Sequence, residues 1–299
     1  MWLILAFISA ILLGSYEVFK KVSLEKNAVI PVIFVSILFS CLTLLPFLLI
    51  SEFSPATLKN TLFFVPRVDF HAHLLFVLKA VIVLTSWLFA YFALKHLPLS
   101  LASPIKATQP MWTVVGAVLI FGEKLNGFQV AGVGITLVSF FMFSFAGKKE
   151  GISFRTNKWF WYIVLATLTG ALSGLYDKYL MKKFDVMSVQ IYYTFYQALI
   201  MGLITLFLWV PTRKKTTPFT FKWAIFWISF FLVTADFVYF YALTLPDSMI
   251  SVVSTIRRSG VIVPFLYGAF VLRDKNIKLK VIDLIGVLIG MFLLYLGSK

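Results

Sequence analysis

The chain has 299 residues, of which 61% are apolar and only 13% are charged. A soluble domain usually carries about 25% charged residues, so the polar residues here are too few to coat a water-soluble globule. The composition excludes a soluble enzyme, a disordered segment and a nucleic-acid-binding domain. The formal net charge of +15 is instead typical of basic residues that flank membrane spans.

The first segment of the chain predicts a permanent membrane span rather than a cleavable signal peptide. It begins Met1-Trp2-Leu3-Ile4 without a basic region, and it stays apolar to Phe19 without a small-residue cleavage site. The single cysteine, Cys41, lies inside an apolar run. We therefore expect neither an internal disulfide nor a cysteine metal cluster.

Apolar runs of membrane-spanning length recur along the whole chain. We expect helices, because a bilayer forces each segment to satisfy its own backbone hydrogen bonds, and the runs lack the alternation of a barrel strand. The chain is predicted to be an all-α polytopic membrane protein with ten transmembrane helices. The predicted spans are 2–19, 29–50, 74–95, 99–121, 127–146, 159–181, 187–210, 222–245, 248–272 and 279–297.

The two halves of the chain resemble each other at a shift of about 150–160 residues. Segment 14–19 of the first predicted span matches 174–179 of the sixth, and segment 92–100 matches 241–248. Five spans is an odd number, so the second copy must enter the membrane from the opposite side. This 5+5 inverted-topology repeat is typical of secondary transporters. The predicted divisions are a first repeat at 1–147, a basic linker at 148–158 and a second repeat at 159–299.

Two motifs give the chain a family resemblance. Phe121-Gly122-Glu123-Lys124 closes the fourth predicted span, and the stretch Ser251-Val-Val-Ser-Thr-Ile-Arg-Arg-Ser-Gly260 is followed by Leu272-Arg273-Asp274-Lys275. With the duplication, these motifs resemble EamA-type members of the drug/metabolite transporter (DMT) superfamily over essentially the whole chain. The resemblance implies a bundle in which spans four and nine line a central cavity and spans five and ten are peripheral. It also implies alternating-access transport of small metabolites, often export of amino acids or related compounds.

Charged residues inside the predicted spans are candidate functional residues, because a charge at the bilayer centre costs roughly 2.5–3.5 kcal/mol on insertion scales. Arg257 and Asp236 lie at similar distances from the turn at Pro246. We expect them at one height, as a structural ion pair, a ligand anchor or a proton-linked switch. Lys106, between two prolines, is either a cavity cation or a side chain that reaches the interface. The predicted substrate-binding residues are Lys106, Gln109, Arg257, Arg258, Asp236 and Trp87.

Gln109 and Trp87 occupy positions in the first half that match Arg257 and Asp236 in the second. A large aromatic side chain and an amide suit the wall of a ligand site. Ordinary packing is the alternative for Trp87.

Two acids, Glu17 and Asp177, lie at matching positions near the carboxyl ends of spans one and six. They are predicted gate or coupling residues; alternatively, they are interfacial acids that balance nearby lysines. The nearby lysines are Lys20, Lys21 and Lys178. Beside the two acids, Tyr16 and Tyr176 are predicted to line the two entrances.

The sequence suggests three candidate functions. The first is a secondary transporter of a small metabolite, driven by a proton or by the substrate gradient. The second is a lipid-handling or scaffold protein without a solute pathway, and the third an intramembrane enzyme, whose usual motifs the sequence lacks. His71 and His73 lie in a predicted connector without further ligands, so we expect neither a metal nor a cofactor.

Lys106 and Arg257 belong to spans that the resemblance places at the cavity. We therefore expect an electropositive cavity and an anionic or zwitterionic substrate, and the resemblance implies export as the direction of transport. Drug efflux is the alternative if only lipophilic cations bind.

The membrane orientation is weakly encoded. Connectors after odd-numbered spans carry 16 Lys and Arg residues, against 6 on the other side. The positive-inside rule would then put both termini outside the cytoplasm, whereas the resemblance implies that they are inside. The charge count and the resemblance nevertheless agree that both termini lie on the same side of the membrane. We expect a multi-pass protein of a bacterial inner membrane, monomeric or homodimeric, whose partners are the lipid bilayer and a small-molecule substrate.

Overall fold

The computed structural model describes residues 2–121, 125–148, 156–181, 183–245, 250–274 and 276–297. Every regular element in these ranges is a helix. Seven of the described helices are long and apolar enough to cross a membrane. They are α1 (Trp2–Leu24), α2 (Val29–Phe53), α4 (Phe70–His96), α8 (Lys158–Met181), α9 (Val186–Ile204) with the turns that extend it to Thr212, α11 (Trp223–Thr244) and α14 (Ile277–Gly297).

Apart from α7 (Gly127–Lys148), which has 22 residues, the remaining helices are shorter. They are α3 (Pro55–Leu58), α5 (Leu99–Ala107), α6 (Gln109–Phe121), the π-helical turn η1 (Thr205–Trp209), α10 (Val210–Thr212), α12 (Ile250–Ser259) and α13 (Ile262–Phe270). The ten-span count and the 5+5 repeat therefore stay predictions. Of the motif at the end of the fourth predicted span, residues 122–124 lie outside the described residues, as does the predicted turn at 246–249.

The fourth and ninth predicted spans are each broken into two helices, which corrects the expectation of one continuous helix. The fourth divides at Thr108, between α5 and α6, and the ninth divides at Gly260, between α12 and α13. A proline follows each break. Pro110 and Pro264 have no N–H to donate to the carbonyl groups four residues earlier, those of Lys106 and Gly260. The two interruptions thus have the same cause.

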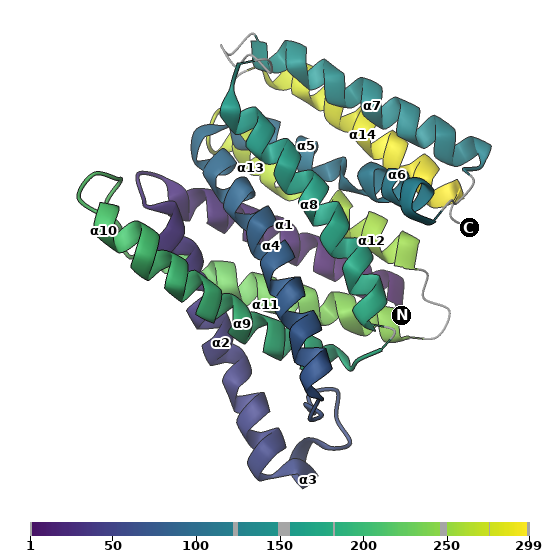
Figure 1. The fold of residues 1–299 in the computed structure, drawn as a ribbon. Coiled ribbons are helices and arrows are strands. Elements are labelled where there is room, and N and C mark those ends of the chain that lie inside the picture. The colour runs from purple at the N-terminus through teal and green to yellow at the C-terminus, as the bar shows by residue number, and fades with distance from the viewer. Residues whose placement is uncertain are drawn as a thin grey trace.

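Helices α7 and α14 pack along each other at one edge of the bundle (Figure 1). Small residues allow this approach, as is common between membrane helices. A Cβ on Gly290 would lie 2.0 Å from Thr136 Oγ1, and a Cβ on Gly286 would lie 2.0 Å from Ser139 Oγ. The edge position of these helices agrees with what the family resemblance implies for spans five and ten.

The helix contacts relate the two halves of the chain. Helix α1 packs along α11 as α4 packs along α8, and α2 contacts α11 as α4 contacts α9. Likewise α1 contacts α12 and α13, while α8 contacts α5 and α6. In each of these pairs, one contact turns into the other when every predicted span is replaced by its counterpart in the other half, five spans away.

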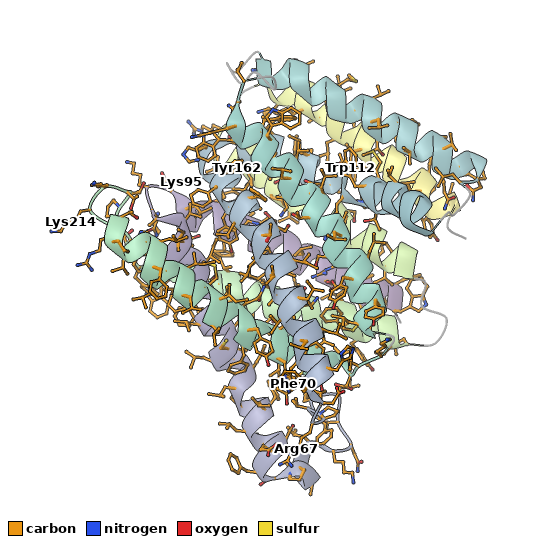
Figure 2. The ribbon with its side chains drawn as sticks, in the orientation of Figure 1. Arg67, Phe70, Lys95, Trp112, Tyr162 and Lys214 are labelled. Carbon is orange, nitrogen blue, oxygen red and sulfur yellow. The ribbon has the colours of Figure 1, made fainter. Side chains whose placement is uncertain are left out.

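Helix α1 starts and α14 ends at the same end of the bundle (Figure 1). Asn126, just before α7, donates a hydrogen bond to the Gly297 carbonyl at 2.6 Å. Lys95 and Lys214 lie toward one end and Arg67 toward the other (Figure 2). The segments that follow α4 and α10 therefore lie opposite the segment between α2 and α4.

Several boundaries differ from the predicted ones, and two of the differences move lysines or histidines from connectors into helices. Helix α1 extends to Leu24, so Lys20 and Lys21 belong to the helix rather than to a connector. Helix α4 begins at Phe70, so His71 and His73 also lie in a helix. His73 Nδ1 lies 3.0 Å from the Tyr196 hydroxyl. Among the described residues, no group of three or more His, Cys, Asp or Glu is placed to hold a metal ion.

Candidate functional site

A small pocket lies where α1 meets both broken spans. Its charged lining residues are Glu17 from α1, Lys106 from α5, and Arg257 and Arg258 from α12. The space open to water molecules is about 30 Å³, room for about one or two waters. A metabolite does not fit this space, so the pocket is closed to a substrate in this conformation.

Two glycines set the position of the pocket. A Cβ on Gly14 would lie 2.5 Å from the Gly260 carbonyl oxygen, and a Cβ on Gly260 would lie 2.1 Å from the Ala10 carbonyl oxygen. Real Cβ atoms do not approach other atoms so closely, so α1 can cross the break of the ninth span here only because both residues are glycine. This crossing brings Glu17, one turn after Gly14, to the arginines of α12.

The Glu17 carboxylate is shared between two lysines. Lys106 Nζ donates a hydrogen bond to Oε1, and Lys20 Nζ lies 2.6 Å from Oε2. Lys20 is 1% exposed, and its ammonium group lies 4.5 Å from the ring centroid of Tyr16 and 5.0 Å from that of Tyr91. The buried charges thus compensate one another.

These contacts bear on three of the candidate residues. Glu17 pairs with Lys106, so the cluster holds a second acid besides Asp236. Lys106 pairs inside the bundle and does not reach the interface. Tyr16 is buried beneath Lys20 at 3% exposure, so it does not line an entrance in this conformation.

Asp236 and Arg257 form an ion pair, as their matched distances from the turn predict. Arg257 Nη2 donates to Asp236 Oδ1, and the Tyr193 hydroxyl donates to Oδ2 at 3.3 Å. The guanidinium carbon of Arg257 lies 4.3 Å from the ring centroid of Tyr239, a cation–π distance. Arg257 Nε is buried and has no hydrogen-bond partner among the described residues.

Arg258 lines the pocket without a partner. Within the described ranges it makes neither an ion pair nor a hydrogen bond. The Ser103 hydroxyl in the same lining is also buried and unpaired there. Most buried polar groups in proteins have partners, so these two groups are free to bind a ligand or water.

The cluster around the pocket carries an excess of two positive charges. Its four cations face two carboxylates, those of Glu17 and Asp236. The four cations are Lys20, Lys106, Arg257 and Arg258.

Asp177 lies apart from the pocket, in an ion pair with Lys79 of α4. Lys79 is 3% exposed, and its Nζ lies 4.6 Å from the ring centroid of Tyr193. Tyr193 in turn contacts Asp236, which links this pair to the pocket. Lys79 is not among the residues predicted from the sequence, although a lone lysine within the third apolar run is a signal for such a site.

Besides Tyr16, Asp177 and Asp236, three further predicted site residues lie outside the pocket lining. Trp87 packs against the largest hydrophobic cluster, which favours the packing alternative. Gln109 is buried against α8, where a Cβ on Gly170 would lie 2.9 Å from its Oε1. The Tyr176 hydroxyl donates to the Leu75 carbonyl at 3.2 Å.

The apolar membrane-length helices and the charges paired between them define an integral, multi-pass membrane protein. Residues 1–145 match the model of the EamA-like transporter family. The first half of the chain is thus similar to this family, and the match supports membership of the DMT superfamily. The family consists of transporters, which fits the expectation that the chain is not an enzyme.

The fold is also that of a solved protein. A structure described only as "Crystal structure of protein" is similar over 98% of this chain and 96% of its own, with a TM-score of 0.65 and 13% sequence identity. At this identity the similarity concerns the fold alone. No curated protein matches the chain.

Proposed function

We propose that the protein is a secondary transporter that moves a small anionic or zwitterionic metabolite by alternating access. The observation that carries this proposal is the pocket between two broken spans, with the unpaired Arg258 in its lining. Interrupted helices at corresponding positions of two repeats are typical of transporter binding sites. Export is the expected direction.

The exchange of helix contacts between the halves supports a duplicated bundle with repeats at 1–147 and 159–299. An inverted repeat can rock about a fixed central site, which opens alternately to each side of the membrane. The closed pocket, with room only for water, fits an occluded or empty state of such a cycle.

The positive excess in the cluster favours a substrate that carries a carboxylate or another anionic group. Arg258 offers a guanidinium, which binds carboxylates and phosphates through two parallel hydrogen bonds. Ser103 and Arg257 Nε offer further unpaired groups nearby. A zwitterion would also need a negative site, which Glu17 or Asp236 supplies.

A thermal-shift screen of the purified protein against anionic, zwitterionic and cationic metabolites tests the substrate class. Uptake of labelled hits into proteoliposomes then tests transport. We expect stabilisation by anionic or zwitterionic compounds and uptake of at least one. Stabilisation by lipophilic cations alone would favour drug efflux, and an absence of uptake would favour a lipid-handling or scaffold protein.

A further inference from the structure

We propose that Glu17 is an internal substitute for the transported anion. In the empty carrier its carboxylate neutralises Lys106, and an entering substrate displaces it and takes over that lysine. This inference rests on the proposed function, since it requires an anionic group to enter the pocket.

The two oxygens of Glu17 have different partners. Oε2 lies against Lys20, three residues later on the same helix and almost completely buried, while Oε1 accepts from Lys106, on another helix. The Lys106 side chain is 18% exposed and lines the pocket. Lys20 is therefore a fixed partner, and Lys106 is the partner that a ligand can reach.

This arrangement lets a substrate replace Glu17 at Lys106, and leave again, without any buried charge losing its partner. When a substrate carboxylate takes Lys106, Glu17 keeps its contact with Lys20. When the substrate leaves, Glu17 compensates Lys106 again. Because an uncompensated buried charge is costly, Glu17 allows the pocket to close when it is empty as well as when it is loaded.

The acid at the matching position of the second half does not share this arrangement. Asp177 pairs with Lys79, which is buried and lies outside the pocket lining. Only one of the two matching acids is thus placed to compete with a substrate. The role belongs to the Glu17 position rather than to the repeated motif.

Acetate binding to the purified full-length protein tests the proposal, with thermal stability followed at constant ionic strength. Glu17→Gln removes the competing carboxylate, so we expect its half-saturating acetate concentration to fall at least about ten-fold. Glu17→Asp keeps the charge but shortens the side chain, so it cannot bridge both lysines. We expect a fall of at least about three-fold, whereas a simple charge effect predicts no change.

Glu52→Gln is the matched control. It also removes one negative charge, but from an exposed pair with Arg67 between α2 and α4, and its acetate response should equal that of the wild type. If both Glu17 variants bind acetate as the wild type does, and Arg258→Gln weakens that binding, Glu17 does not compete and the proposal is wrong. If no variant and no wild-type sample responds to acetate, both the anionic pocket and this inference fail.

Discussion

Gly14 of α1 and Gly260 of the broken ninth span touch without space for a side chain, since a Cβ on Gly14 would lie 2.5 Å from the Gly260 carbonyl oxygen. This contact holds α1 against α12 and α13. It thereby places Glu17, Lys106 and the arginines around one pocket.

Because of this contact, adding one methyl group at either glycine should lower the stability of the protein substantially. Gly14→Ala and Gly260→Ala should each destabilise the protein by about 1–3 kcal/mol, the usual cost of overpacking. Gly174→Ala is the matched control, because Gly174 lies at the position that corresponds to Gly14 but has open space around its Cβ direction. Thermal unfolding of the three variants in detergent measures the difference. Equal stability of Gly14→Ala and Gly174→Ala would contradict the close crossing.

Substitutions of Asp236 and Arg257 should have non-additive effects on stability, because the two side chains form one ion pair. Asp236→Ala and Arg257→Ala should each cost about 3–5 kcal/mol, because each leaves a buried charge without its partner. The double change Asp236→Leu/Arg257→Met should recover most of that stability. Since Arg257 also lines the pocket, we expect the double variant to fold but not to transport. Transport at the wild-type rate by either single variant would show that the pair neither stabilises the fold nor takes part in transport.

One end of the bundle is fastened by contacts at the start of α5. Asp274 Oδ2 accepts from the Ser100 N–H at 2.9 Å, and Lys280 Nζ donates to Ser100 Oγ at 2.9 Å. Lys21 Nζ donates to the Leu94 and Leu97 carbonyls nearby.

Asp274→Ala should therefore destabilise the closed conformation by about 0.5–2 kcal/mol, the range measured for the loss of a helix cap. In a Cys41→Ser background, a cysteine introduced by Ser103→Cys should also become more reactive toward thiol reagents. Unchanged reactivity would mean that these contacts do not help to close the pocket. Asp274→Asn, which retains an acceptor oxygen, is the control and should have a smaller effect.

Because α1 starts and α14 ends at the same end of the bundle (Figure 1), both termini should face the same compartment. Reporters that are active in opposite compartments, fused to the amino and the carboxyl terminus, should give the same result at both ends. Opposite results would exclude an even number of spans, and with it the ten-span count.

Sequence periodicity and charge depth were enough to predict the helical class and the pairing of Asp236 with Arg257, which are only 21 residues apart in the sequence. Other contacts depend on how distant helices cross. Glu17 and Lys106 meet because of the glycine crossing, which no local pattern encodes. Lys20 stands at the end of an apolar run and resembles a connector residue, yet the helix continues past it to Leu24. The breaks did leave a local signal, since Pro110 and Pro264 follow them.

Arg258 offers the most direct test of the anionic-substrate account, because it lines the pocket without an ion-pair partner among the described residues. Arg258→Gln should leave the stability of the ligand-free protein unchanged or slightly raised, since it removes a half-buried charge that has no ion-pair partner among the described residues. Proteoliposome uptake of the carboxylate that best stabilises the wild type should fall at least about ten-fold in this variant. Arg67→Gln, at an exposed site, should transport normally. Wild-type uptake by Arg258→Gln would contradict the account.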